Sequence, residues 1–345
     1  MTTSPSSPTL GQPGTASAVP QPARRISVAL CTYNGARFLD AQLDSFAAQT
    51  RLPDELVACD DRSTDDTIAV LEAFARRAPF LVRIERNEGT LGSTKNFEKA
   101  IRLCSGDFIA TSDQDDVWLP EKLALSVAAF DQDPARGLVF TNSEVVDEDL
   151  HPIGHAMFDA IQFGPAARRR VRRGNAFAVL LRQWLVTGAT MMFRSEYRQF
   201  VLPIPENWVH DAWIAFIIGA MAPVGCIERP MVMYRQHAAQ QIGGKKLTWR
   251  ELYDKAREVG APHFRLAYER FMLARERLGE FASHVRDPRV LPLVDKKVEH
   301  QRRRLAIAES ASRLKRVVWT LDELRRGGYT RFSHMTLHFI KDMFF

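Results

Sequence analysis

Ile26-Ser-Val-Ala-Leu-Cys-Thr32 and Glu55-Leu-Val-Ala-Cys59 are short runs rich in apolar and β-branched residues, the pattern of strands buried in a sheet. Between them, large apolar side chains from Phe38 to Phe46 recur at the spacing of a helix. A strand, a helix and a second strand in this order predict a right-handed βαβ unit with parallel strands. The fold prediction is built outward from this unit.

The same alternation continues as far as residue 141. We expect strands at 81–85, 108–111 and 138–141, and helices at 63–77, 93–103 and after Pro120. Ser63 is the expected N-cap of the helix at 63–77. Strands that alternate with helices of this length indicate the α/β class, with a Rossmann-like, mostly parallel sheet covered on both faces. In such sheets, ligands bind at the carboxyl ends of the strands.

The second half of the chain is less regular. We expect a strand at 186–193, a helix at 208–221, a strand at 230–234, and a loop at 165–175 that holds five arginines. From about residue 246 onward, charges are dense and apolar residues recur at helical spacing. We therefore divide the chain into a disordered tail (1–24), an α/β domain (25–245) and a basic helical extension (246–345).

Charge is distributed unevenly along the chain. Residues 245–345 contain 23 Lys and Arg against 13 Asp and Glu, whereas the remaining residues contain 24 against 28. The extension, with its terminal aromatic segment 339–345, is therefore expected to contact a polyanion or an anionic membrane surface. The alternative is an ordinary solvated helical surface. Nucleic acid is not expected, because the basic residues are not interleaved with aromatic residues that would stack on bases.

The cysteines and the hydropathy pattern indicate a cytoplasmic protein. Cys31, Cys59, Cys104 and Cys226 form no CxxC pair, and two of them lie in apolar strands, so we expect reduced, buried thiols. No run approaches the ~18 consecutive apolar residues that a membrane-spanning helix requires, and no secretion signal is evident. The expected location is the cytoplasm, with peripheral contact at the inner face of the cytoplasmic membrane as an option.

Acidic residues follow two of the expected strands. Asp60 and Asp61 end the strand at 55–59, and Asp113, Asp115 and Asp116 follow the strand at 108–111. Carboxylates that lie close together raise each other's pKa unless a cation is present. Mg²⁺ or Mn²⁺ suits such oxygen ligands and completes its shell with phosphates and water. The alternative is that these aspartates are turn or helix-cap residues.

Four motifs then occur in order along the chain. They are Leu30-Cys-Thr-Tyr-Asn-Gly35, Asp60-Asp-Arg-Ser-Thr-Asp-Asp-Thr67, Asn87-Glu-Gly-Thr-Leu-Gly-Ser-Thr-Lys-Asn96 and Ser112-Asp-Gln-Asp-Asp-Val-Trp118. Together they resemble the nucleotide-sugar-binding half of family 2 glycosyltransferases, which have the GT-A fold. The Ser-Asp-Gln-Asp-Asp form is similar to the rhamnosyltransferase-like branch that builds bacterial surface polysaccharides. The resemblance covers residues 26–237.

The resemblance implies a donor site at the carboxyl ends of the first strands. The pocket for the pyrimidine and ribose would be lined by Thr32, Tyr33 and Asn34. Asp60 or Asp61 would accept a hydrogen bond from the base. Lys95 stands where many family members carry Arg, and it would approach the base or the diphosphate as a point charge. Its alternative is an exposed helix lysine.

The resemblance also implies a metal and diphosphate site. Asp113 and Asp115 would bridge the ribose, the diphosphate and a Mg²⁺ or Mn²⁺ cofactor. Residues 234–237 resemble the Arg-Gln-His segment of the family. Arg235 would therefore meet a phosphate, and His237 would ligate the metal or contact the diphosphate.

The acceptor side would come from the second half of the domain. Trp208-Val-His-Asp-Ala-Trp213 resembles the acidic catalytic segment of the family, which makes Asp211 the expected general base. The alternative for Asp211 is a helix N-cap. Thr187 and Gly188 match the small-residue strand on the acceptor side, and Trp213 would be an aromatic acceptor contact.

These features imply an inverting, metal-dependent glycosyltransferase. It would move a sugar, with rhamnose favoured, from a dTDP- or UDP-activated donor to a glycan or lipid-linked glycan in cell-envelope polysaccharide synthesis. Two other classes stay open. One is a nucleotidyltransferase, although residues 32–36 lack the basic residue of its usual phosphate loop. The other is a non-catalytic module that binds a polyanion or a membrane. The sugar, the acceptor and the linkage depend on loops that the sequence does not place.

Overall fold

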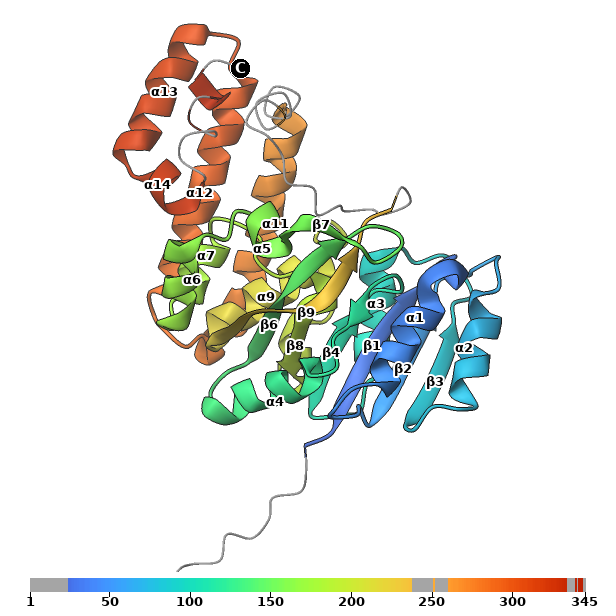
Figure 1. The fold of residues 1–345 in the computed structure, drawn as a ribbon. Helices are drawn as coiled ribbons and strands as arrows, with labels where there is room; N and C mark the ends of the chain where they lie inside the picture. Colours follow the sequence, from blue (N-terminus) through green and yellow to red (C-terminus); the bar gives the residue numbers. More distant parts are fainter. Residues whose placement is uncertain (1–23, 238–250, 252–259, 334–338, 340, 344–345) are drawn as a thin grey trace, which may run out of the picture.

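The centre of the molecule is a mixed β-sheet (Figure 1). The computed structural model describes residues 24–237, 251, 260–333, 339 and 341–343. Within these residues the sheet has nine strands in the order β3-β2-β1-β4-β8-β6-β9-β5, with β7 paired to β6. The strands are β1 (Ile26–Thr32), β2 (Glu55–Asp60), β3 (Leu81–Arg86), β4 (Phe108–Ser112), β5 (Val117–Trp118), β6 (Leu138–Val146), β7 (Pro152–Ala156), β8 (Met191–Arg194) and β9 (Val224–Arg235).

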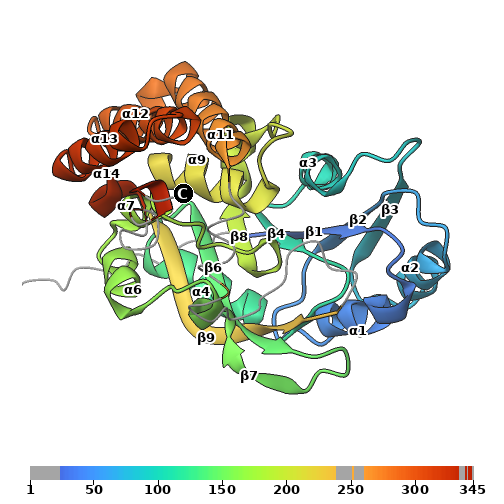
Figure 2. The ribbon, with the colours of Figure 1, turned by 90° about the horizontal axis from the view of Figure 1, so that it is seen from above.

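Helices cover both faces of this sheet. Figure 2 shows α1 and α2 on one face and α3 and α9 on the other. The helices of the α/β domain are α1 (Ala36–Ala47), α2 (Thr67–Ala75), α3 (Ser93–Leu103), α4 (Lys122–Gln132), α5 (Met157–Ala160), α6 (Pro165–Arg172), α7 (Ala176–Leu180), α8 (Arg198–Val201) and α9 (His210–Met221). Strands β3, β2, β1 and β4 pair in parallel. Two buried apolar clusters fill the faces of the sheet. The predicted α/β fold is confirmed.

Strand β8 departs from the parallel order. It runs antiparallel between β4 and β6, while β6 and β9 pair in parallel beyond it. The single strand predicted at 186–193 is therefore wrong in its first half, because Gly188–Thr190 forms a 3₁₀ turn. The backbone N–H of Thr190 donates to the Thr187 carbonyl at 3.0 Å, and Thr111 Oγ1 donates to the Gly188 carbonyl at 2.5 Å. These bonds bend the chain before it enters the sheet.

Two local predictions are also wrong. Helix α2 begins at Thr67 rather than at Ser63, because the Ser63 backbone N–H and hydroxyl both donate to the Asp60 carboxylate. The loop predicted at 165–175 contains helix α6 instead. Proline at the first helical position and arginines in the last turn both favour a helix there.

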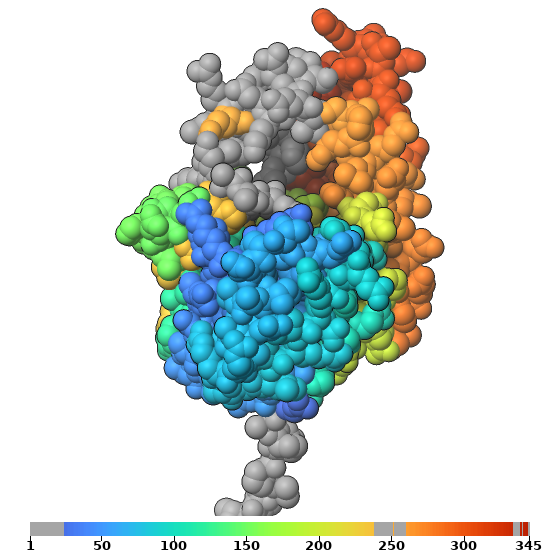
Figure 3. All heavy atoms as spheres, turned by 90° about the vertical axis from the view of Figure 1, so that its right-hand side faces the viewer, coloured from blue at the N-terminus to red at the C-terminus, as the bar shows by residue number. Residues whose placement is uncertain are grey.

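The C-terminal extension is helical, as predicted, and it projects beyond the α/β domain (Figure 3). Its described elements are α11 (Ala261–Glu280), a 3₁₀ turn (Ala282–His284), α12 (Val290–Glu309), α13 (Arg313–Arg325) and α14 (Gly328–Phe332). Helix α11 packs on α9, with the Phe271 ring centroid 5.7 Å from that of Trp208 and 5.5 Å from that of Phe216. The extension thus shares a core with the domain. The predicted disordered tail, up to residue 23, and the predicted boundary at 245 lie outside the described residues.

Candidate active site

Three aspartates from distant segments meet at the edge of the sheet where β4 ends. Asp113 and Asp115 follow β4, and Asp211 lies in the first turn of α9, whose N-cap is Val209. Burial raises the pKa of Asp113 to about 8, and the negative charges of Asp115 and Asp211 add to this rise. Because Asp211 acts on Asp113 electrostatically, the structure joins the two halves of the domain in one acidic site.

Asp211 is held at the edge of this site by backbone groups. Burial raises its pKa to about 6, while hydrogen bonds from the backbone N–H groups of Ala212 and Gly188 oppose the rise. A carboxyl group with such a pKa is ionised near neutral pH and still basic enough to accept a proton. Its surroundings therefore suit a general base.

Gly188 brings the acceptor-side turn against the acidic site. A Cβ atom at this position would lie 2.6 Å from His210 Nε2 and 3.6 Å from Asp113 Oδ2. His210 is itself buried and stacks on Phe97, with ring centroids 3.8 Å apart. Burial lowers the pKa of His210 to about 3, so the imidazole is neutral. Only a residue without a side chain fits between His210 and Asp113.

Arg235 and His237 close the site from the end of β9. His237 Nε2 lies 2.7 Å from Asp115 Oδ2, within hydrogen-bond distance. Arg235 Nε donates to the Asp115 carbonyl at 2.7 Å, and the Arg235 backbone N–H donates to Asp116 Oδ1 at 3.1 Å. The Arg235 side chain also donates to the Glu148 carbonyl. Arg235 therefore positions the segment of Asp115 and Asp116, through the Asp115 carbonyl and the Asp116 carboxylate.

Sequence reasoning missed two residues of this site. Tyr234 is mostly buried, and its pKa is raised by burial and then by the charges of Asp116, Asp113, Asp115 and Asp211. Its phenol thus lies in the field of all four carboxylates. Gln114 Oε1 accepts the Tyr33 backbone N–H at 2.8 Å, and Gln114 Nε2 donates to the Tyr33 carbonyl at 3.0 Å. Both residues lie inside motifs described above. The phenol of Tyr234 and the amide of Gln114 were the signal from which their place in the site could have been predicted.

The predicted metal ligands Asp113, Asp115 and His237 fit Mg²⁺ or Mn²⁺ by type. A cation would relieve the burial and repulsion that raise the pKa of Asp113. Nevertheless, no three His, Cys, Asp or Glu side chains among the described residues already form a metal-binding group. His237 Nε2 lies 2.7 Å from Asp115 Oδ2, so the two side chains are close enough together to serve as neighbouring ligands of one ion.

The Thr32 and Asp60 side chains, which were predicted to bind the donor, are hydrogen-bonded to each other. Both are buried, and Thr32 Oγ1 donates to Asp60 Oδ2 at 3.0 Å. Asp60 Oδ1 also accepts the Ser63 backbone N–H at 2.9 Å. These bonds tie the ends of β1 and β2 together. Thr32 and Asp60 therefore stabilise the wall of the pocket. The Thr32 hydroxyl and the Asp60 carboxylate both have hydrogen-bond partners within the protein.

Asp61 organises the loop that precedes α3. Its carboxylate accepts hydrogen bonds from Asn87 Nδ2 at 2.8 Å and from the backbone N–H groups of Leu91 and Gly92 at 2.7 and 2.8 Å. Asp61 and Asp113 both raise the pKa of the buried Cys31 thiol, in addition to the larger effect of burial. Asp61 therefore lies at the same edge of the sheet as Asp113.

Tyr33 and Asn34 are exposed at the end of β1. Asn34 has a positive φ of 48°, and its Oδ1 accepts the Thr64 backbone N–H at 2.8 Å. Asparagine adopts this left-handed conformation more readily than most residues. The turn leaves the Tyr33 side chain open to a ligand.

Lys95 and Trp213, predicted to contact the donor and the acceptor, are both hydrogen-bonded to other parts of the fold. Lys95 Nζ donates to Glu98 Oε2 at 2.8 Å and to the Ile204 carbonyl at 2.7 Å, so its charge stabilises the contact of α3 with the segment at 204. Trp213 is fully buried, and its indole N–H donates to the Val201 carbonyl at 2.7 Å. The Trp213 ring is therefore enclosed by the fold, and the Lys95 ammonium is held by Glu98 and Ile204.

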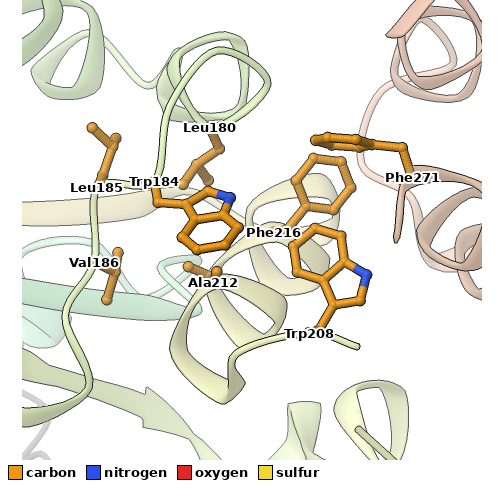
Figure 4. Close-up of a pocket in the computed structure, with 9 residues that line it drawn as sticks. Leu180, Trp184, Leu185, Val186, Trp208, Ala212, Phe216 and Phe271 are labelled. Carbon is orange, nitrogen blue, oxygen red and sulfur yellow. The ribbon is translucent and has the colours of Figure 1, made fainter. Parts of the chain in front are cut away.

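An apolar pocket lies beside Asp211, between the segments of α7, α9 and α11 (Figure 4). Val186 and Ala212, the chain neighbours of Thr187 and Asp211, line it together with Trp208. Trp208 donates its indole N–H to the Arg270 carbonyl at 3.0 Å. Trp184 lines the other side of the pocket and is exposed. Helix α11 thus supports the segment that carries Asp211.

Two features bear on the cellular environment. The four cysteines are free thiols, and Cys31, Cys59 and Cys104 are buried, as predicted for the first two. None of the helices in the described parts of the chain combines the length and the hydropathy that crossing a bilayer requires.

Comparison with known proteins agrees with the fold and the motifs. The model of the family "Glycosyl transferase family 2" matches residues 27–196. A dTDP-rhamnosyl transferase of Shigella flexneri is 24% identical over 231 residues, or 62% of this chain and 73% of that protein. An uncharacterized protein of Mycobacterium tuberculosis is 28% identical over 216 residues, or 62% of this chain and 59% of that protein. The match thus spans less than two thirds of the mycobacterial relative.

A solved structure gives the same result for the fold. The crystal structure of Staphylococcus aureus TarS 1-349 in complex with UDP-GlcNAc superposes with a TM-score of 0.52 at 16% identity, covering 91% of this chain and 90% of that one. The α/β domain is therefore a GT-A domain, the class that the sheet order and the acidic edge define. The α/β domain, which the family model matches over residues 27–196, belongs to glycosyl transferase family 2. The predictions of family and fold are confirmed.

Proposed function

We propose that this protein is an inverting, metal-dependent glycosyltransferase that moves a sugar from a nucleoside diphosphate to a glycan or lipid-linked glycan acceptor. The observation that carries the proposal is the meeting of Asp113 and Asp115 with Asp211 and Gly188 at one edge of the sheet. Rhamnose is the favoured sugar, because a relative is named a dTDP-rhamnosyl transferase. Cell-envelope polysaccharide is the favoured product on the resemblance of the motifs.

The donor would lie along the ends of β1, β2 and β4. Tyr33 and Asn34 are exposed there, and Asp61 holds the adjoining loop. Asp113, Asp115 and His237 would hold Mg²⁺ or Mn²⁺, which supplies positive charge near the leaving diphosphate. Arg235 keeps the acidic segment in place through the Asp115 carbonyl.

The chemical step would use Asp211 as the general base. An acceptor hydroxyl oxygen attacks the anomeric carbon from the face opposite the diphosphate and forms the new glycosidic bond. The bond from that carbon to the phosphate oxygen breaks, and the nucleoside diphosphate leaves with the electron pair. Asp211 takes the hydroxyl proton, so no covalent sugar–enzyme intermediate is required. Thr187 and Gly188 would face the acceptor, and Trp184 is the exposed aromatic side chain beside them.

The proposed location is the cytoplasm, at the inner face of the membrane. Free cysteines, three of them buried, are typical of a reducing compartment. The basic extension would supply the contact with anionic lipid, since each Lys or Arg near such a surface contributes ~1 kcal/mol.

The test is to incubate the purified protein with dTDP-rhamnose and with UDP-sugars, each with and without Mn²⁺ or Mg²⁺. We expect release of the nucleoside diphosphate from one donor, dependent on the ion and abolished by Asp113→Ala. Release of diphosphate from a nucleoside triphosphate would instead indicate a nucleotidyltransferase. Absence of turnover, together with polyanion binding that Asp113→Ala leaves unchanged, would indicate a non-catalytic module.

A further inference from the structure

Helix α13 packs against the rest of the extension through polar side chains. Thr320 and Glu323 are buried. Thr320 Oγ1 donates to the Asp342 carbonyl at 3.3 Å, and Glu323 Oε1 lies 2.7 Å from His300 Nδ1. The inner side of α13 is thus held by hydrogen bonds to α12 and to the end of the chain.

The outer side of the same helix is apolar. Leu314, Val318 and Leu321 are 73%, 53% and 39% exposed, and their spacing of four and three residues places them on one stripe. Trp319, which lies about 100° further round the helix than Val318, is 41% exposed. On a helix at the surface of a water-soluble domain, such a stripe normally faces the core. On α13 this second apolar stripe is exposed, while Val317 and Leu324 are half-buried on the inner side with Thr320.

Basic side chains surround this stripe. Residues 310–333 contain six Lys and Arg against two Asp and Glu. Arg313, Lys315 and Arg325 are exposed on α13 itself. Of the two acidic residues, Glu323 is buried and Asp322 pairs with Arg326 at 2.8 Å. The outward surface therefore combines apolar side chains with positive charge.

We propose that this surface of α13, which we call the α13 face, lies in the interface of a bilayer with anionic headgroups. The α13 face comprises Leu314, Val318, Trp319, Leu321, Arg313, Lys315 and Arg325. Helices that lie in the membrane plane bury an apolar stripe, place Trp at the headgroup level and pair Lys or Arg with anionic lipid. The inference identifies the surface that makes the membrane contact of the proposed function, and it rests on that part of the proposal.

A second copy of the chain fits the α13 face less well. Two copies related by a twofold axis would bring the same positive side chains toward each other. Like charges at close range oppose association, whereas an anionic lipid surface attracts them. The positive charge of the α13 face therefore favours contact with an anionic membrane over contact with a second copy of the chain.

The terminal segment 339–345 was predicted to contact the membrane, but its described residues pack within the protein instead. Its described residues Lys341 and Asp342 are buried. The Asp342 carboxylate accepts two hydrogen bonds from Arg304, at 2.5 and 2.9 Å, and one from the Tyr329 hydroxyl at 2.7 Å. Phe344 and Phe345 lie outside the described residues. The membrane contact thus moves from the terminal segment to α13.

Vesicle flotation of the full chain tests this inference. The probes are vesicles of phosphatidylcholine alone and of an equal mixture of phosphatidylcholine and phosphatidylglycerol. We expect binding to the mixed vesicles that weakens at high salt. Replacing Leu314, Val318 and Leu321 together by Ser should weaken it by more than about tenfold, because the buried apolar area is lost. The matched control replaces Leu81, Leu91 and Ile153, which are exposed apolar residues of the α/β domain, by Ser.

Each outcome decides the inference. It is overturned if the wild type does not bind mixed vesicles at low salt, or if the two triple variants bind equally. It is also overturned if sedimentation equilibrium shows a dimer that only the α13 variant loses while vesicle binding is unchanged. Release of nucleoside diphosphate without vesicles separates this test from the proposed function. The α13 variant should keep that release, and its absence in the wild type would contradict the function alone.

Discussion

Gly188 decides how closely the acceptor-side turn approaches Asp113. Replacing it by Ala places a Cβ atom 2.6 Å from His210 Nε2, far inside normal contact distance. Either the turn or the His210 ring has to move, and overpacking of this kind costs ~1–3 kcal/mol. We expect Gly188→Ala to lower the free energy of unfolding by this amount in chemical denaturation, and to lower kcat.

The matched control is Gly164→Ala. No atom lies within 4 Å of a Cβ built at Gly164, and its φ of −74° suits any residue. Its stability and activity should stay near those of the wild type. If both variants behaved alike, the close approach of Gly188 to His210 would have no functional role.

Asp211 gives a prediction about pH. Burial raises its pKa to about 6, so the carboxyl group is protonated below that pH and cannot accept the acceptor proton. As pH rises through about 6 the carboxylate forms, and kcat should rise with it. In Asp211→Asn this acidic limb should disappear, and kcat should fall ~10²–10⁴-fold.

Donor affinity distinguishes a base from a structural residue at this position. Isothermal titration with the nucleoside diphosphate should give the same affinity for Asp211→Asn and the wild type. An Asn variant that keeps its turnover would exclude Asp211 as the base while leaving the family assignment intact.

At the scale of elements, the loop between β3 and α3 depends on Asp61. Its carboxylate accepts the backbone N–H groups of Leu91 and Gly92, and hydrogen bonds to a charged group contribute ~1.5–3 kcal/mol. In Asp61→Asn an amide replaces the charge, so one of these bonds is lost. We expect faster hydrogen exchange at Leu91 and Gly92 and weaker donor binding.

The comparison variant for the loop is Asp40→Asn on the exposed side of α1. Exchange at Leu91 and Gly92 should not change in this variant. Unchanged exchange in Asp61→Asn would mean that the loop is ordered by other contacts.

Most elements of the domain follow from local patterns. Strands β1, β2, β3 and β4 were predicted within one residue, because each is a short apolar or β-branched run bounded by turns or helices. Two of the mispredicted elements, α6 and the turn before β8, have weak local signals. Arginines in a short segment resemble a loop, and the turn at Gly188 forms through a bond from Thr111, which lies on another strand.

In the whole molecule, helix α11 of the extension packs into the core of the GT-A domain. Phe271 of α11 is 8% exposed and packs on Trp208, while its neighbour Met272 is 44% exposed. Phe271→Ala leaves a cavity beneath the segment that carries Asp211. We expect it to lower the free energy of unfolding by ~3–5 kcal/mol and to reduce kcat.

Met272→Ala is the matched control, since a surface substitution of this kind stays within about 0.5 kcal/mol. Thermal and chemical denaturation measure both variants. Equal effects of the two substitutions would show that α11 does not support the domain.

The α/β class, the parallel strands and the acidic residues at their carboxyl ends could all be predicted from the amino-acid sequence. These follow from side-chain period and from the right-handed βαβ connection, which are local or chiral rules. Three features required the folded structure: Asp211 lies against Gly188 and acts on Asp113, Trp213 is buried while Trp184 is exposed, and α13 has an apolar stripe that faces outward. Which side of a helix is buried depends on partners distant in the chain, and a periodic pattern alone does not contain that information.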